Sequence, residues 1–435
     1  MTARQASSAA VERFQDDRFG MFVHWGLYSL IGTNEWVMFH DRYSRHEYAQ
    51  LAQRFDAPDF DADAWVQLAA EAGQRYLTIT SRHHDGFSMY DTSLSEHKVT
   101  KTPFGRDPIA ELAEAGARHG VRLGFFVSLV DWHHPAYRAH VREVSGLAWS
   151  DYLGFLSGQV RELCTQYGDI AQFWLDGYWP QEPHTTAFPN WFAPGGDFDF
   201  GELYELIHTL QPDAVVVNNH HAVPFPGEDV QEYEGDIAGE NTHPHGINVT
   251  APVLTAGETC QTVTSTSYGF ARDVHEYRPA SELASLLARA AGAGSNLLLN
   301  VGPTPEGTIP APAADRLTRL GAWLGRAGEG IYATRAGVLR VADKFGDNSL
   351  AGHVASTRGK NDDGVHYIHL LDGSVPTSFV VDFPAGVNAS SVEATLLHDG
   401  GEVRAEIRAD GDSLHVTVPA ERRDGLITTV RLAVQ

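Results

Sequence analysis

The sequence predicts an α/β protein made of an irregular (β/α)₈ TIM-like barrel and a C-terminal antiparallel β-sandwich. Two observations carry this prediction. Up to about residue 335, short apolar runs alternate with amphipathic stretches, as strands and helices do around a parallel sheet. After roughly residue 336, apolar residues recur at every second position instead. We therefore expect a barrel domain over residues 1–335 and a sandwich domain over residues 336–435.

Eight apolar runs are candidates for the barrel strands. They are Met21–Gly26, Tyr76–Ser81, Arg122–Leu129, Ala171–Asp176, Ala214–Asn219, Asp229–Glu234, Val253–Thr259 and Asn296–Val301. Stretches with helical spacing of apolar residues, such as residues 153–163, lie between several of them. Between the fifth, sixth and seventh runs the chain is too short, or too rich in Gly and Pro, for full helices. The barrel is therefore expected to be irregular there.

The period-two pattern of the last hundred residues predicts the sandwich. The runs VHYIHLL, SFVVDF, VEATLL, SLHVTVP and ITTVRLAV are separated by DG, GG and PAG turns. Such a spacing of short strands and turns is typical of antiparallel sheets. Both a carbohydrate-binding module and a domain that only packs against the barrel have this pattern.

Charge and composition exclude several classes of partner. Acidic residues outnumber basic ones by 56 to 32, which gives a formal net charge of −24. Such a charge repels nucleic acid and anionic membrane surfaces, so neither is expected as a partner. No apolar stretch suits a secretion signal or a membrane span, which predicts a cytoplasmic protein. The two cysteines, Cys164 and Cys260, are expected to be reduced.

Three of the predicted strands end on polar side chains. MFVHWG contains His24, YLTITSRHHDGF contains His83 and His84, and FWLDGYW contains Asp176. Barrel enzymes carry their catalytic groups at the carboxyl ends of the strands. Strand alternation puts Asp176 on the same face as Trp174, which predicts a carboxylate beside an aromatic wall at the barrel mouth.

A second carboxyl group is needed if this site cleaves glycosidic bonds with retention. The two groups then lie roughly 5–5.5 Å apart. The candidates in the barrel are Glu35, Asp85, Asp131, Glu232, Glu234, Glu240 and Glu258. Glu234, at the end of EDVQEYE, is placed to reach across the mouth, whereas Glu232 on the same strand face is expected to lie deeper.

Histidine is frequent, with 22 copies and three adjacent pairs, at 83–84, 133–134 and 220–221. Neighbours on a strand point to opposite faces, so such a pair is poorly arranged to chelate one metal ion. Neither an H-E-x-x-H motif nor a Cys/His cluster occurs. We expect neutral imidazoles that hydrogen-bond a polar ligand, and we keep a metal-dependent hydrolase as an alternative.

Tryptophan is concentrated near the predicted strand ends and the loops after them. The residues concerned are Trp25, Trp36, Trp132, Trp174, Trp179 and Trp191. An indole offers a flat apolar face to a sugar ring and an N–H group to a hydroxyl. The long loop Tyr178–Phe200 is a candidate lid or wall for such a ligand. No phosphate-binding glycine loop follows a strand, so no nucleotide site is expected.

Seven stretches together resemble glycoside hydrolase family 29, the retaining α-L-fucosidases. They are RFGMFVHWGLYSL, NEWVMF, SRHHDGFSMYDTS, GFFVSLVDWHHP, FWLDGYW, ETCQTVTSTSYGF and NLLLNVGPTPEGTIP, which span about residues 18–310 in the family's order. The resemblance implies a catalytic barrel with a β-sandwich, no metal or other cofactor, and a double-displacement mechanism. It also implies that Asp176 is the nucleophile. Glu234, which falls within GEDVQEYEGDIAGEN, corresponds to the acid/base.

The resemblance implies a set of sugar contacts as well. His24, Glu35, Trp36, His83, His84 and Trp174 fall on family positions that contact fucose, and Tyr268 is expected to bind substrate with them. Three differences from the family's usual pattern bear on the sugar preference. They are Phe126-Val127-Ser128 in place of Tyr-Tyr-Ser, Ser267-Tyr268-Gly269-Phe270 in place of Ser-Trp-Gly-Tyr, and His220 in place of an arginine.

The predicted activity is the hydrolysis of terminal α-L-fucosides. An α-L-galactosidase, whose substrate has an additional C6 hydroxyl, is the nearest alternative, and a non-catalytic sugar-binding protein is another. In the predicted mechanism Glu234 starts protonated. We therefore expect burial and the charge of Asp176 to raise the pKa of Glu234.

Overall fold

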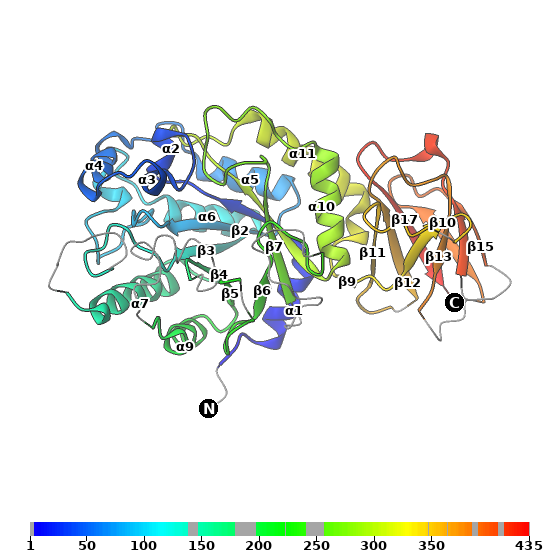
Figure 1. Ribbon diagram of the computed structural model, residues 1–435, viewed down its shortest axis with the longest axis horizontal. Coiled ribbons are helices and arrows are strands. Elements are labelled where there is room, and N and C mark those ends of the chain that lie inside the picture. Colours follow the sequence, from blue (N-terminus) through cyan, green and yellow to red (C-terminus); the bar gives the residue numbers. More distant parts are fainter. Residues whose placement is uncertain are drawn as a thin grey trace.

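The structure is a computed structural model in which a barrel and a pair of antiparallel sheets lie side by side (Figure 1). It describes residues 4–137, 147–178, 197–221, 223–240, 256–346, 348–362, 364–384, 390–407 and 413–434.

Eight parallel strands close into the barrel in sequence order, with β1 paired to β8. They are β1 Phe19–Val23, β2 Tyr76–Arg82, β3 Arg122–Ser128, β4 Ile170–Asp176, β5 Val215–Asn219, β6 Val230–Glu232, β7 Ala256–Thr262 and β8 Ser295–Val301. Each corresponds to one of the predicted runs, which confirms the predicted fold. Where the sixth run was expected to extend to Glu234, β6 ends at Glu232, so Glu234 lies in the loop after it.

Helices surround the barrel. They are α1 Ser8–Asp17, α2 Tyr28–Ile31, α3 Val37–His40, α4 Arg45–Ala49, α5 Ala62–Glu71, α6 Pro108–His119, α7 Trp149–Gln166, α9 Phe200–Leu210, α10 Ala280–Gly292 and α11 Ala311–Ala327. α6 shows why these segments are helical, since Asp107 accepts a hydrogen bond from the Ala110 N–H at its start and Gly120 ends it. The described residues between β5 and β6 contain no helix, as expected.

Strand alternation separates two sets of side chains. Phe22, Phe126 and Trp174 belong to a cluster inside the barrel. Phe173 and Leu175, the neighbours of Trp174 on β4, belong instead to the core between the barrel and its helices. Trp174 and Asp176 therefore share the inner face, as the sequence pattern predicted.

The C-terminal strands form two antiparallel sheets. One has the order β10 (Arg340–Asp343), β13 (Ser378–Asp382), β16 (Ser413–Thr417) and β15 (Arg404–Ile407). The other has the order β14 (Val392–Leu396), β17 (Thr428–Val434), β12 (Val365–Leu370), β11 (Val354–Gly359) and β9 (Thr334–Ala336). Apolar side chains of both sheets, including Phe379 and Val430, form one core. The expected domain boundary after residue 335 falls within β9 and stays a prediction.

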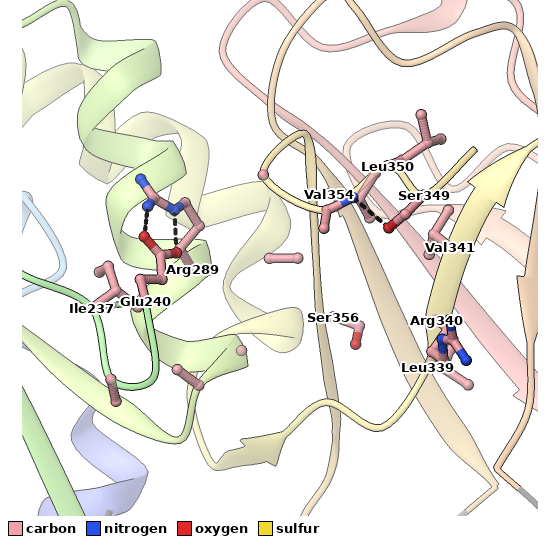
Figure 2. Close-up of a pocket in the computed structure, with 16 residues that line it drawn as sticks. Ile237, Glu240, Arg289, Leu339, Arg340, Val341, Ser349, Leu350, Val354 and Ser356 are labelled. Atoms are coloured by element: carbon pink, nitrogen blue, oxygen red, sulfur yellow. Dashed lines mark hydrogen bonds and ion pairs between the residues drawn. The ribbon is translucent and has the colours of Figure 1, made fainter. Parts of the chain in front are cut away.

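A cavity of about 390 Å³ lies between the barrel and the sandwich. Figure 2 shows Arg289 of α10 paired with Glu240 on its barrel side, and Leu339 and Val354 on its sandwich side. Glu240 lines this cavity, whereas Asp176, Glu234 and the predicted sugar contacts do not. Both cysteines are free and buried. In the part of the chain that the structure describes, no helix is long and apolar enough to cross a membrane.

Candidate active site

The polar side chains predicted at the strand ends converge at the carboxyl end of the barrel. Asp176 is the last residue of β4, and its neighbour in the β4–β5 register is Asn219, the last residue of β5. Gly177 follows Asp176 with φ at 110°, in the region that favours glycine. A Cβ atom at Gly177 would also lie 3.0 Å from the backbone nitrogen of Val130. The Asp-Gly sequence therefore lets the chain turn away directly after the carboxylate.

Asn219 joins Asp176 to Glu234. Its Nδ2 atom donates to Asp176 Oδ1 at 3.1 Å and to Glu234 Oε2 at 2.7 Å. The distance between these two oxygens therefore cannot exceed the sum of the two hydrogen-bond lengths. That limit falls short of the roughly 6.5–9.5 Å that separates the carboxyl groups of inverting glycosidases, and it accommodates the roughly 5–5.5 Å of retaining ones.

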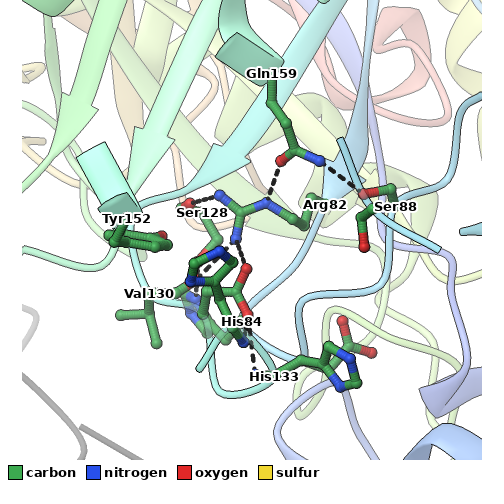
Figure 3. A network of polar contacts seen from close by, with 12 residues as sticks. Arg82, His84, Ser88, Ser128, Val130, His133, Tyr152 and Gln159 are labelled. Atoms are coloured by element: carbon green, nitrogen blue, oxygen red, sulfur yellow. Dashed lines mark hydrogen bonds and ion pairs between the residues drawn. The ribbon is translucent and has the colours of Figure 1, made fainter. Parts of the chain in front are cut away.

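His84 contacts the other oxygen of Asp176. Its Nε2 atom lies 3.4 Å from Asp176 Oδ2, and its Nδ1 atom lies 2.5 Å from Ser128 Oγ. Burial lowers the pKa of His84 to about 3, so the ring is neutral at ordinary pH. Figure 3 shows this imidazole beside the network around Arg82.

Three imidazoles form a row across the mouth of the barrel. The ring of His83 lies 5.5 Å from that of His24 and 4.2 Å from that of His84. Burial lowers the pKa of His83 well below its usual value and that of His24 to about 4. The expectation that an adjacent pair points to opposite faces is wrong for His83 and His84. The β2 strand ends at Arg82, after a register shift, so the two histidines do not follow strand alternation.

His24 has a defined orientation. Its Nδ1 atom lies 2.7 Å from Asn300 Oδ1, and the Asn300 amide nitrogen donates to the backbone oxygen of Tyr268. The amide oxygen of Asn300 is therefore the acceptor, and Nδ1 of His24 carries the hydrogen. This leaves Nε2 of His24 as an acceptor for a ligand hydroxyl.

Aromatic rings line one side of the site. Phe126 stacks between His83, at 5.3 Å, and Trp174, at 5.4 Å. Trp36 meets His84 edge-on at 4.9 Å, and the Tyr268 ring lies 5.0 Å from that of His24. Six of the predicted contact residues and both carboxyl groups are thus connected through these contacts.

The seventh predicted contact, Glu35, is held by the loop that carries Tyr268. Its Oε2 atom accepts a hydrogen bond from the Gly269 N–H at 2.8 Å and lies 3.2 Å from Ser267 Oγ. Burial raises the pKa of Glu35.

Not every tryptophan proposed for the site lies there. Trp25 stacks on Phe60 and packs against Trp65 in the core outside the barrel, and its N–H group donates to the Thr304 carbonyl. Trp132 does reach the site, at 5.5 Å from Trp36. Trp179, Trp191 and most of the loop Tyr178–Phe200 lie outside the described residues.

Five of the other candidate carboxyl groups form hydrogen bonds or ion pairs with residues other than Asp176. These contacts are Asp85 with the Tyr48 hydroxyl at 2.9 Å, Asp131 with Arg82 at 2.9 Å, Glu232 with the Cys260 N–H at 3.0 Å, Glu258 with the Tyr76 hydroxyl at 2.6 Å, and Glu240 with Arg289. Glu232 also accepts the indole N–H of Trp174 at 3.3 Å, inside the barrel, as its expected deeper position requires. Glu234 is the candidate that faces Asp176.

The expected rise in the pKa of Glu234 is wrong. Burial raises its pKa, but the hydrogen bond and charge of His221, together with hydrogen bonds from Asn219 and Tyr268, outweigh burial and lower it to about 2. Burial and then the charge of Glu234 raise the pKa of Asp176 well above its usual value. Two close carboxyl groups disfavour a second negative charge, so the pair favours holding one proton between them.

Asn219 and His221 were not among the predicted site residues. His220, the residue in place of the family's arginine, points away from the site and pairs with Glu228 at 3.0 Å. His221 adopts a left-handed backbone with φ at 55°, and its Nε2 atom lies 3.4 Å from Glu234 Oε2. Strand alternation was the available signal for Asn219, which shares the inner face of β5 with Val215 and Val217. It gave no signal for His221, because β5 ends at Asn219.

The described part of the chain contains no group of three or more His, Cys, Asp or Glu side chains arranged to hold a metal ion.

Comparisons with known proteins agree with this geometry. The family model described as Alpha-L-fucosidase matches residues 1–329. The chain is 28% identical over 429 residues to the alpha-L-fucosidase of Dictyostelium discoideum, covering 91% of this chain and 84% of that protein. It is also 28% identical over 355 residues to tissue alpha-L-fucosidase of Homo sapiens, covering 74% and 69%.

A solved structure gives the same result. Alpha-L-fucosidase isoenzyme 1 from Paenibacillus thiaminolyticus matches the fold with a TM-score of 0.81 at 29% identity, covering 98% of this chain and 99% of that one. Since the family model spans the whole barrel, with both carboxyl groups of the site, this chain belongs to the alpha-L-fucosidase family.

Proposed function

We propose that this protein is a retaining exo-glycosidase that hydrolyses terminal α-L-fucosides. Family membership and the names of its relatives support the substrate. The observation that carries the mechanism is the contact of one amide nitrogen with both Asp176 and Glu234, because it keeps the two carboxyl groups close enough for a covalent intermediate.

The reaction proceeds in two displacements. In the first, a carboxylate oxygen of Asp176 attacks the anomeric carbon, the glycosidic bond breaks, and Glu234 gives its proton to the leaving oxygen. In the second, Glu234 removes a proton from a water molecule whose oxygen attacks the same carbon. The ester bond to Asp176 then breaks, which releases the sugar with its original configuration and regenerates both groups.

The first displacement needs Asp176 ionised and Glu234 protonated. The pair favours holding one proton, because Asn219 keeps the two carboxyl groups close and a second negative charge so near the first is unfavourable. We infer that this proton lies on Glu234 when Asp176 attacks.

The neutral imidazoles of His24, His83 and His84 support binding of a sugar that carries several hydroxyls. A neutral imidazole both donates and accepts a hydrogen bond, as a hydroxyl does. Glu35, Trp36, Trp174 and Tyr268 complete the proposed contacts with the sugar. The cytoplasmic location expected from the sequence stays a prediction.

Replacing Asp176 by glycine tests the proposal. We expect Asp176→Gly to lower turnover of an aryl α-L-fucoside by about 10³-fold or more. Added azide should restore turnover and yield the β-L-fucosyl azide, because a small nucleophile then attacks once from the vacated side. Near-normal activity without azide would remove Asp176 as the nucleophile. The matched control is Asp169→Gly, at the exposed residue directly before the same strand, which should behave as the wild type.

An α-L-galactoside is the second candidate substrate. The observation in its favour is Phe126, whose ring is stacked between His83 and Trp174 where the family often has a tyrosine hydroxyl. Comparing kcat/KM for aryl α-L-fucoside and aryl α-L-galactoside decides between the two sugars. A higher value for the galactoside would replace the proposed substrate and leave the mechanism unchanged.

A further inference from the structure

We propose that Asn219 positions the two catalytic carboxyl groups, setting both their separation and their orientation. This inference rests on the proposed function. It assigns a role to a residue that neither the motifs nor the predicted contacts included.

The geometry that supports it is a double donation. A side-chain amide nitrogen carries two hydrogens, and those of Asn219 point to Asp176 Oδ1 at 3.1 Å and to Glu234 Oε2 at 2.7 Å. The two N–H bonds diverge in the plane of the amide. They therefore set both the distance between Asp176 Oδ1 and Glu234 Oε2 and the direction in which each oxygen faces.

Asn219 is well placed to act as a rigid reference point. It is 3% exposed, ends β5, and is in register with Asp176 on β4. Side chains carried on strands hold catalytic geometry more precisely than those carried on loops. Glu234, in contrast, lies in the loop after β6, so its position depends more on side-chain contacts of this kind.

Side chains that point away from the site fix the position of the β5 end. Asn218 Nδ2 donates to the Tyr204 hydroxyl at 2.7 Å, and His220 contacts Glu228 at 3.0 Å. Asn218 is thus also an asparagine on β5 and is buried to a similar extent as Asn219, but its side chain points away from the site. It offers a matched control.

An amide suits this position because it donates without titrating. Asn219 stabilises negative charge on either carboxyl group, yet it cannot take up the proton that the pair must exchange during the reaction. Titratable side chains also face the pair, and the charge of His221 acts on both carboxyl groups. His84 contacts Asp176, and His221 contacts Glu234. Tyr268 lies on the Glu234 side as well.

The test compares Asn219→Ala and Asn219→Asp with Asn218→Ala. We measure kcat, KM and the pH dependence of kcat/KM on an aryl α-L-fucoside. Hydrogen bonds to charged groups justify an expected loss of about 10- to 100-fold in kcat for Asn219→Ala, with KM changed much less. Both limbs of its pH profile should move to higher pH, because two donors to the ionised carboxylates are gone.

The isosteric Asn219→Asp separates positioning from folding. It keeps the shape of the side chain and replaces the donor by an oxygen, so it should fold and lose at least as much kcat as the alanine variant. Its alkaline limb should move up further, because a third negative charge then faces the pair. Asn218→Ala should keep both limbs at their wild-type positions.

The outcomes distinguish this inference from the proposed function. If the wild type turns over neither α-L-fucosides nor α-L-galactosides, the proposed function fails and this inference fails with it. Suppose instead that the wild type is active, both Asn219 variants keep kcat within twofold of it, and the limbs of their pH profiles do not move. This inference alone is then overturned. Equal kcat losses and limb shifts in Asn218→Ala and Asn219→Ala would show a merely structural role and overturn it as well.

Discussion

The hydrogen between His84 and Asp176 belongs to the carboxyl group. The Ser128 hydroxyl donates to the Val130 carbonyl at 2.6 Å, so its oxygen accepts from Nδ1 of His84 at 2.5 Å. In the neutral ring Nε2 then carries no hydrogen, and it faces Asp176 Oδ2 at 3.4 Å. This agrees with the raised pKa of Asp176.

Removing the Ser128 hydroxyl should change the titration of the pair. In Ser128→Ala the imidazole of His84 is free to carry its hydrogen on Nε2 and to donate it to ionised Asp176. Such a bond favours the charged form, so the pKa of Asp176 falls and the alkaline limb of kcat/KM moves to lower pH. The pH profile on an aryl α-L-fucoside measures this shift.

Ser81→Ala is the control for that experiment. It removes a buried hydroxyl that donates to the Phe126 carbonyl on the neighbouring strand and should leave the limb in place. An alkaline limb unmoved in Ser128→Ala would contradict the hydrogen-bond assignment of His84.

Glu234→Ala should affect substrates according to their leaving groups. A poor leaving group needs the proton of Glu234, so kcat/KM for an unactivated disaccharide should fall by about 10²- to 10⁴-fold. For an aryl fucoside with a good leaving group, the rate of the first displacement should fall far less. Glu240→Ala, an exposed carboxylate later in the same loop, is the control. Equal losses on both substrates would point to a different acid/base.

Arg82 should be essential for stability. Its buried guanidinium donates to Asp131 at 2.9 Å, to Gln159 at 2.8 Å and to the Ser128 carbonyl at 2.7 Å (Figure 3). Arg82→Met leaves Asp131 buried without a counter-charge, which costs about 3–5 kcal/mol. Urea unfolding measures the loss.

The matched variant for Arg82 is Arg118→Met, which breaks an exposed ion pair with Asp63 and should change stability little. Similar losses in the two variants would show that the buried network contributes no more than a surface pair.

Glu258→Gln should stabilise the protein as pH rises. Burial raises the pKa of Glu258 from 4.5 to about 8. Between these values the folded state holds a proton that the unfolded state has lost, so wild-type stability falls as pH increases through this window. Glu258→Gln removes this pH-dependent loss of stability. The difference in melting temperature, variant minus wild type, should grow from about pH 4.5 to pH 8 and then level off.

Glu306→Gln, at an exposed position in the barrel, is the control and should show no such trend. A melting-temperature difference for Glu258→Gln that stays constant over the same pH range would contradict the raised pKa.

Local patterns in the sequence determined much of this protein. Hydrophobic periodicity predicted the eight barrel strands and the sandwich, because the period of apolar residues follows directly from the geometry of each element. Position at a strand end, together with family motifs, pointed to Asp176, Glu234 and the three histidines His24, His83 and His84. These predictions need no knowledge of distances between segments.

The tertiary structure decided how those residues act on one another. The double donation of Asn219 and the choice of His221 over His220 depend on the register of neighbouring strands and on the path of the loop after β6. The location of the shared proton depends on burial and on the hydrogen bonds that each carboxyl group accepts. These energies vary steeply with separation between segments far apart in the chain, and no local pattern encodes that separation.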